Sequence, residues 1–246
     1  MESETFRDYL SGVMSSESSL GDILKPVVQN DKHHAEGDVF THTRMVRSRL
    51  PMAIEFIRRE ASKPGSIFSN VGTSYDKREM KILKLAAWFH DIGKATATKV
   101  DGGRITAHGH ESPGHYMPQI SKLSGGLKDI YDSLPREDRE VLFFVIDNHM
   151  SLQQDGGFPR KLWGSIFDGE GKIRDEIKPK LLVTLIIMDR TGRIRGEDFM
   201  PHVRTFSQKQ DLSKVHADKE FAAMMDPLHK SRDKHLTRLG NIERNS

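Results

Sequence analysis

The chain of 246 residues contains no cysteine, 30% charged residues and 36% hydrophobic residues, and its mean hydropathy is −0.57. This composition excludes disulfide partners, cysteine-ligated zinc and thiol catalysis, and a formal charge of +3 is too small to indicate a nucleic-acid-binding protein by itself. No apolar run approaches the roughly 20 residues of a membrane span, and the acidic start does not resemble a signal peptide, so we expect a soluble, cytoplasmic protein with no membrane partner.

Residues 1–24 include the serine-rich stretch 15–19, and we expect them to form an N-terminal extension. In the segment 77–90, apolar residues recur at helical spacing among lysines and arginines. Gly93 lies just beyond this segment and supplies a helix stop. The pattern therefore predicts a helix that ends close to His90.

A small β-hairpin is expected next, near residues 97–107. Two runs that favour strands, 97–100 and 104–107, flank the sequence Asp-Gly-Gly at 101–103. Such a sequence is typical of tight hairpin turns, because glycine adopts the positive φ angles that these turns require.

Two further helices follow. The first opens with proline and acidic residues after Leu134 and runs to about His149; acidic residues suit the positive end of the helix dipole. The second opens at Lys178 and is apolar nearly all round until Asp189. A helix without a polar face is typical of the buried centre of a bundle.

These patterns predict an all-α fold, a helical bundle with one small hairpin. We expect one main domain over residues 25–195. Residues 196–246 are polar with charges of both signs, and we expect them to form a C-terminal extension that is partly helical around 214–225. The sequence leaves the oligomeric state open.

The chain has 12 histidines, and eight of them lie between positions 33 and 149. An imidazole and a carboxylate, His90 and Asp91, emerge together at the end of a predicted helix. Imidazoles and carboxylates are common ligands of divalent ions, and a carboxylate has two oxygens with which it can bridge two ions. The pair alone is a weak signal, so its neighbours decide whether it indicates a metal centre.

Five separated motifs occur in a characteristic order: His42 after Phe-Thr, Phe-His-Asp-Ile-Gly-Lys at 89–94, His-Gly-His-Glu at 108–111, Asp-Asn-His-Met at 147–150 and Met-Asp-Arg-Thr-Gly-Arg at 188–193. Together they resemble the HD-domain metal-dependent phosphohydrolases. With His-Ala-Glu-Gly-Asp at 34–38 they are most similar to the HD domain of bacterial CCA-adding tRNA nucleotidyltransferases. The resemblance covers roughly residues 30–193.

The resemblance implies a ligand set for one or two divalent ions. The first ion would be held by His42, His90, Asp91 and Asp189. His110 and His149 would hold a second ion, with Asp91 shared. Nitrogen and oxygen ligands with open positions suit Mn²⁺, Ni²⁺, Co²⁺, Fe²⁺ or Mg²⁺ better than a closed structural zinc site.

The resemblance also implies residues that contact the substrate. Lys94 is similar to the family lysine that contacts phosphate, and a cation beside the metals neutralises phosphoryl oxygens during displacement. Asp91 and Lys94 are therefore the predicted catalytic residues. Lys94, His108 and Arg193 are the predicted substrate-binding residues.

The sequence departs from the resembling family at several places. Ala35 and Ala95 replace prolines of the family pattern, and the nucleotidyltransferase signature Gly-Gly-x-x-Arg-Asp does not occur. The chain is therefore predicted not to add CCA. We expect the phosphohydrolase module standing alone.

Three functions fit these motifs. The first is a phosphohydrolase that uses metal-activated water on nucleotide or RNA 3′-end phosphates, as a 2′,3′-cyclic phosphodiesterase, a 2′-phosphatase or both. The second is a nucleotidase, dNTP hydrolase or cyclic-dinucleotide hydrolase with the same site. The third is a non-catalytic nucleotide-binding module.

Some residues near the motifs have two interpretations. His34, Glu36 and Asp38 either form a capping loop before the helix of His42 or orient the metal ligands. Arg190 and Arg193 are either charges that suit a helix C-terminus or phosphate contacts. Histidines outside the motifs, such as His33, are expected at the surface or in structural positions.

Overall fold

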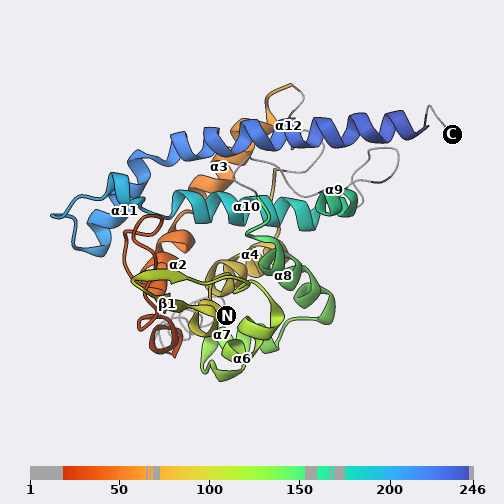
Figure 1. Cartoon of the computed structure of the whole chain (residues 1–246). Helices are drawn as coiled ribbons and strands as arrows, with labels where there is room; N and C mark the ends of the chain where they lie inside the picture. Colours follow the sequence, from red (N-terminus) through yellow and green to blue (C-terminus); the bar gives the residue numbers. More distant parts are fainter. Residues whose placement is uncertain are drawn as a thin grey trace, which may run out of the picture.

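A computed structural model describes residues 19–64, 66, 68, 73–152, 160–166, 168 and 175–243. These residues form helices joined by loops, together with one antiparallel sheet of two strands (Figure 1). The prediction of an all-α bundle with one small hairpin is confirmed. Within the described ranges, no helix has both the length and the apolar character that crossing a membrane requires.

A helical turn at 19–24 precedes the labelled elements. These follow in the order α2 (Val39–Ser48), α3 (Leu50–Ala61), α4 (Lys77–Phe89), α5 (Lys94–Ala97), β1 (Lys99–Asp101), β2 (Arg104–Thr106), α6 (Pro113–Lys122), α7 (Gly126–Asp132), α8 (Arg136–Asn148), α9 (Arg160–Ile166), α10 (Ile177–Thr191), η1 (Gly196–Asp198), α11 (Phe206–Val215) and α12 (Ala217–Glu243).

Side-chain caps fix where two of the site-bearing helices begin. The side chain of Asp38 accepts a hydrogen bond from the backbone N–H of Thr41 and so caps α2. Asp76 and Glu79 form a reciprocal capping box at the start of α4. Such caps satisfy backbone N–H groups that have no partner inside the helix. Because each helix begins at a fixed residue, the side of the helix on which each later residue lies is also fixed.

Helix α10 lies at the centre of the bundle. It contacts α2, α3, α4, α8 and α12, and nearly every residue from 179 to 189 is buried. A helix that is apolar on all sides can bury each side chain against a different neighbour, and each large aliphatic side chain contributes about 1.5–3 kcal/mol. The prediction of a central buried helix matches the structure, and its last turn is held rigidly at one end of the bundle.

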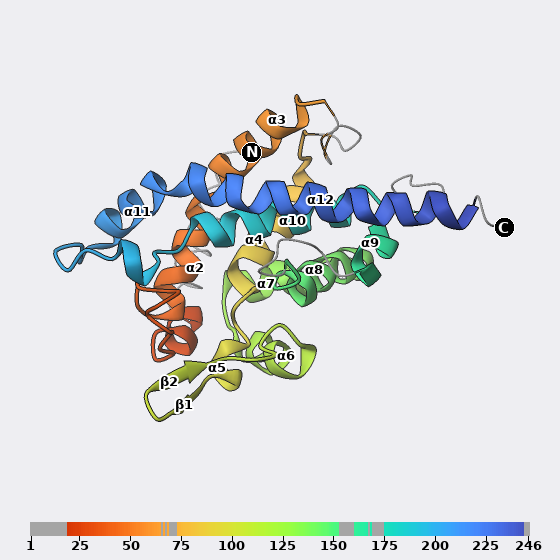
Figure 2. The same ribbon diagram turned by 45° about the horizontal axis from the view of Figure 1, so that its top comes forward.

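The hairpin pairs Lys99 with Thr106 and Val100 with Ile105. Its turn contains Gly102 and Gly103 at φ angles of 53° and 81°, which side chains other than glycine rarely adopt. Figure 2 shows the hairpin projecting from the edge of the helices rather than packing inside them. Residues of its second strand, Arg104–Thr106, line a pocket at this edge.

Helix α12 runs alongside α10 in both ribbon views (Figures 1 and 2). Phe221 and Met224 belong to the same hydrophobic core as α10. The sequence pattern predicted helix around 214–225, whereas the structure ends α11 at Val215 and begins α12 at Ala217. The division of the chain into a main domain at 25–195 and a C-terminal extension stays a prediction.

Candidate metal centre

Six side chains from five segments converge at one end of α10. They come from α2, from the residues that follow α4, from the loop after β2, from the residue that follows α8 and from the last turns of α10, and all are buried: His42, His90, Asp91, His110, His149 and Asp189. These are the six ligands implied by the resemblance. The structure brings all of them together.

Two glycines allow the backbones around this cluster to approach closely. A Cβ added to Gly93 would lie 2.0 Å from the carbonyl oxygen of His110, and one added to Gly192 would lie 2.8 Å from Cα of Val46. No side chain fits at such distances without moving the backbone. Glycine at these two positions therefore lets the loop of His110 reach Asp91 and the end of α10 reach α2.

Three histidines are oriented by the same local contact. Nδ1 of His90, His110 and His149 lies 3.0, 2.8 and 2.7 Å from the backbone carbonyl oxygen three residues earlier. A neutral imidazole that donates from Nδ1 has a bare lone pair on Nε2. Each ring therefore presents a metal-binding nitrogen toward the centre of the cluster.

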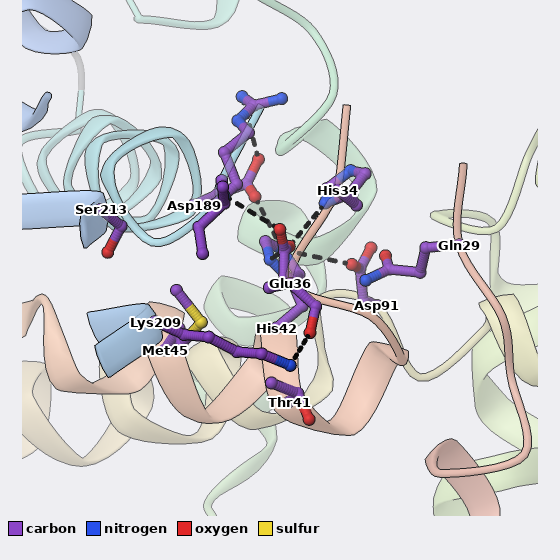
Figure 3. A network of polar contacts seen from close by, with 12 residues as sticks. Gln29, His34, Glu36, Thr41, His42, Met45, Asp91, Asp189, Lys209 and Ser213 are labelled. Atoms are coloured by element: carbon purple, nitrogen blue, oxygen red, sulfur yellow. Dashed lines mark hydrogen bonds and ion pairs between the residues drawn. The ribbon is translucent and has the colours of Figure 1, made fainter. Parts of the chain in front are cut away.

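His42 reaches the same orientation through a carboxylate. Its Nδ1 lies 2.7 Å from Oε1 of Glu36 and its Nε2 lies 3.0 Å from Oδ1 of Asp189 (Figure 3). Burial would lower the pKa of His42, but hydrogen bonding to Asp189 and Glu36 outweighs it and raises the pKa to about 9. The other oxygen of Glu36 accepts a hydrogen bond from the N–H of Ile194, so this carboxylate is fixed in place.

Asp91 lies in the middle of the ligands. Its Oδ1 is 3.0 Å from Nε2 of His110 and 3.7 Å from Nε2 of His149, whereas its Oδ2 is 3.5 Å from Nε2 of His90. Oδ2 also accepts a hydrogen bond of 2.7 Å from Nζ of Lys94. Burial would raise the pKa of Asp91, but Lys94 and His90 hold it well below its usual range. The carboxylate thus offers one oxygen to each side of the cluster.

The donor set fits divalent cations. Nε2 of His90 is buried and has no hydrogen-bond partner among the described residues, and Nε2 of His110 lies 3.2 Å from Nε2 of His149. Two bare lone pairs at that distance repel each other, and an unpartnered buried nitrogen is unfavourable. One cation beside His90 and another between His110 and His149 would satisfy these nitrogens. Among the described residues, three groups of ligand atoms lie within 4.8 Å of one another: His34, Glu36 and His42; His42, His90 and Asp91; and Asp91, His110 and His149. Asp91 belongs to the last two groups.

A pocket of about 530 Å³ opens onto the cluster, and the three predicted substrate-binding residues, Lys94, His108 and Arg193, all line it. Lys94 is buried and donates hydrogen bonds to Asp91 and to Oε1 of Gln29, so its position is fixed. His108 is exposed at the pocket wall. Val28 and Met150 also line the pocket and are about half exposed, at 51% and 54%, which gives it an apolar rim.

The structure separates the interpretations that the sequence left open at 34–38. Asp38 caps α2, whereas Glu36 contacts the ligand His42. Nδ1 of His34 lies 3.0 Å from the same oxygen of Glu36, and burial lowers the pKa of His34 to about 4. Asp38 therefore caps the helix, and Glu36 orients the candidate ligand His42.

Sequence reasoning missed several pocket residues. Gln29 contacts Lys94 but belongs to no motif, and His33, expected at the surface, lines the pocket. Arg190 also lines the pocket, and burial, followed by the nearby charge of Arg193, lowers its pKa. The motif order gave no signal for Gln29 and His33, because they are placed by the loop before α2.

The fold and the cluster together define a helical protein with a buried histidine and aspartate centre that can hold divalent cations. The chain is similar to the Multifunctional CCA protein of Shewanella frigidimarina (strain NCIMB 400), with 26% identity over 175 residues. The similar region is 71% of this chain and 33% of that protein, so the chain spans about a third of the relative's length. No protein-family profile matches the chain. No solved structure gives a significant match.

Proposed function

We propose that the protein is a divalent-metal-dependent phosphohydrolase that acts on nucleotide or RNA 3′-end phosphates, as a 2′,3′-cyclic phosphodiesterase, a 2′-phosphatase or both. One observation carries the proposal. Four imidazoles place Nδ1 on an oxygen acceptor and Nε2 on a shared cluster around Asp91, next to a buried lysine in an open pocket. This arrangement suits cations and phosphate together.

The ligand set divides into two groups that share a carboxylate. His42, His90, Asp91 and Asp189 would hold one ion, and His110 and His149 would hold a second with Asp91. Bound divalent ions of the Mn²⁺, Ni²⁺, Co²⁺, Fe²⁺ or Mg²⁺ type would activate water and neutralise phosphoryl oxygens. Glu36 and the three backbone carbonyls engage Nδ1 of the four imidazoles, which leaves Nε2 as the nitrogen that a cation would bind.

The remaining pocket residues position a phosphate ester. Nζ of Lys94 is held beside Asp91 and presents a positive charge to a phosphoryl oxygen, whose charge grows during displacement. The rim of Val28 and Met150 offers an apolar surface on which a nucleobase can lie. His108 is exposed at the wall and is available for contact with a sugar or phosphate oxygen.

Two features favour nucleotides and RNA ends over other phosphate esters. The motifs resemble the HD domain of CCA-adding tRNA nucleotidyltransferases, and the chain is similar to a curated protein named Multifunctional CCA protein. The nucleotidyltransferase signature does not occur in the sequence, and the chemistry proposed for these residues is hydrolysis. A cytoplasmic location is part of this proposal.

The test combines metal analysis with an assay of 2′,3′-cAMP hydrolysis. Wild-type protein incubated with Mn²⁺, Ni²⁺ or Mg²⁺ should retain metal and hydrolyse the substrate with at least one of them. Asp91→Ala should lose all detectable hydrolysis, because both ligand groups share this carboxylate, while circular dichroism remains that of a helical bundle. Hydrolysis of dNTPs or cyclic dinucleotides but not of 2′,3′-cAMP would contradict the proposed substrate class.

A further inference from the structure

Two arginines in the pocket wall are not among the candidate ligands of the proposed metal centre. Arg190 lies in the last turn of α10, and Arg193 follows the end of this helix. Both are partly buried and both line the pocket. They stand three residues apart in the chain and line the same pocket.

Neither guanidinium is satisfied by the protein. Within the described ranges, Arg190 forms no hydrogen bond or ion pair, and Arg193 has only a contact of 3.9 Å to Asp189. Nε of Arg193 is buried with no partner among those residues. In contrast, the guanidinium of Arg49 contacts two carbonyls and a hydroxyl, and that of Arg195 contacts Glu220.

Partly buried guanidinium donors without acceptors are unfavourable, and an anion supplies the missing acceptors. A cation near a helix C-terminus also stabilises the helix dipole. That effect needs only a charge near the last carbonyls, and it does not explain a buried, unpartnered Nε in a pocket wall. The two arginines are therefore available to bind an anion in this pocket.

The pocket carries enough positive charge to bind more than one phosphate. Its lining contains two acidic residues, Asp91 and Asp189, which are both candidate metal ligands. It also contains four lysine and arginine side chains: Lys94, Arg104, Arg190 and Arg193. Bound divalent ions would add further positive charge. One phosphate at the metals and Lys94 leaves Arg190 without an anionic partner among the described residues of the pocket and Arg193 with only the contact of 3.9 Å to Asp189.

We propose that Arg190 and Arg193 form a second phosphate subsite, so that the preferred substrate carries a phosphate on its 5′ oxygen in addition to the phosphate at the metal centre. This inference rests on the proposed function. A volume of about 530 Å³ accommodates a nucleotide with two phosphates, since ligand pockets commonly span about 300–1,000 Å³. The 5′ phosphate has two sources, a mononucleotide 5′ end or the phosphodiester that joins the last two residues of an RNA.

Three substrates test the subsite: adenosine 2′,3′-cyclic phosphate, its 5′-phosphorylated form, and the dinucleotide ApA with a 2′,3′-cyclic end. Wild-type protein should show kcat/KM about tenfold higher for a substrate with the second phosphate. The second and third substrates distinguish a 5′ monoester from a phosphodiester as the preferred group. Equal kcat/KM for all three substrates would overturn the subsite while leaving the proposed function standing.

The variant Arg190→Gln tests whether the preference for a second phosphate depends on the arginines of the pocket wall. It should reduce the preference for the second phosphate about tenfold. Arg136→Gln is the matched control, because it removes the same charge from a side chain that is 92% exposed and paired with Glu140 outside the pocket. The control should keep the wild-type preference. A preference that survives Arg190→Gln would overturn the assignment.

A binding measurement keeps the subsite testable without turnover. Mn²⁺-loaded protein should bind adenosine 3′,5′-bisphosphate about tenfold more tightly than adenosine 3′-monophosphate, and Arg190→Gln should remove the difference. Tighter binding of the bisphosphate by a protein that hydrolyses none of the three substrates would support the subsite and contradict the proposed function. Equal binding of both nucleotides by the wild type would contradict the subsite.

Discussion

Each histidine of the candidate centre is oriented at Nδ1 and presents Nε2. Backbone carbonyls orient His90, His110 and His149, whereas the carboxylate of Glu36 orients His42. A carboxylate behind an imidazole fixes its tautomer and makes it a stronger ligand. Glu36 is fully buried, and its two oxygens contact His34, His42 and the N–H of Ile194. It therefore fixes the ring of His42, one of the candidate ligands.

Glu36→Gln should lower the affinity for Mn²⁺ about 10- to 100-fold, because the amide leaves His42 without its charged partner. Isothermal titration calorimetry with Mn²⁺ measures the effect. Glu55→Gln, which makes the same change at an exposed position of α3, should bind Mn²⁺ as the wild type does. Wild-type affinity in Glu36→Gln would show that the carboxylate only stabilises the loop.

Lys94→Ala should reduce kcat on 2′,3′-cAMP by about 10²-fold or more, because its ammonium group neutralises charge that develops on the phosphoryl oxygens. Its metal content, measured by plasma mass spectrometry, should remain that of the wild type, because lysine is not a ligand. Lys219→Ala removes an exposed lysine of α12 and should leave both quantities unchanged. Loss of metal from Lys94→Ala would contradict the role assigned to the lysine.

Most side chains of the candidate centre could be predicted from the sequence. The order of the motifs placed six ligands, from His42 to Asp189, that the structure brings into one cluster. The separate roles of Glu36 and Asp38 were not predictable, because they depend on how the loop turns between them. Gly37 makes that turn at a φ of 114°, which directs Glu36 toward His42 and leaves Asp38 at the start of α2.

The segments that carry the candidate ligands come together because the backbone approaches closely at two glycines. Gly93 lies against the backbone of His110, and Gly192 lies against that of Val46. Gly93 and Gly192 have ordinary right-handed φ angles of −67° and −87°, so their importance is steric rather than conformational. Gly192 brings the end of α10 against Val46 of α2. This contact places Asp189 beside His42.

Gly192→Ala should therefore destabilise the protein by about 1–3 kcal/mol, since its Cβ would meet backbone atoms of Val46. It should also weaken Mn²⁺ binding, since Asp189 and His42 would separate. Gly164→Ala is the control, because Gly164 lies in α9 with no atom within 4 Å of a built Cβ. Urea unfolding should show Gly164→Ala to be neutral or stabilised by up to about 1 kcal/mol. Equal stability of the two variants would refute the steric argument.

The helices themselves were predictable where the apolar pattern is strong. Segments 77–90, 134–149 and 178–189 correspond to α4, α8 and α10, and the caps at Asp76 and the buried surface of α10 explain why. The break between α11 and α12 at His216 was not predicted, because no glycine or proline marks it. The close approaches at the two glycines were not predictable either, since they depend on tertiary packing.

Over the whole molecule, the C-terminal helices are tied to the bundle by a buried arginine. Arg49 is 1% exposed and donates hydrogen bonds to the carbonyls of Thr191 and Gln210 and to the hydroxyl of Ser213. These partners lie at the end of α10 and in α11. The contact joins the segment that carries Asp189 to residues beyond the predicted main domain.

Arg49→Ala should destabilise the protein by about 2–4 kcal/mol, because it leaves buried acceptors without a donor. Denaturant unfolding measures the loss. Arg136→Ala, which breaks an exposed pair with Glu140, should change the free energy of unfolding by no more than about 0.5 kcal/mol. If Arg49→Ala unfolded at the wild-type midpoint, α11 would not depend on this contact.

The most direct test of the metal centre is anomalous X-ray diffraction from crystals of the wild type grown with Mn²⁺. The account predicts an anomalous peak about 2.0–2.3 Å from Nε2 of His90 and from a carboxylate oxygen of Asp91, as expected for direct coordination. A second peak would lie at the same distance from Nε2 of His110 and His149. An ordered His90 and Asp91 in saturating Mn²⁺ with no peak between them would contradict the central claim.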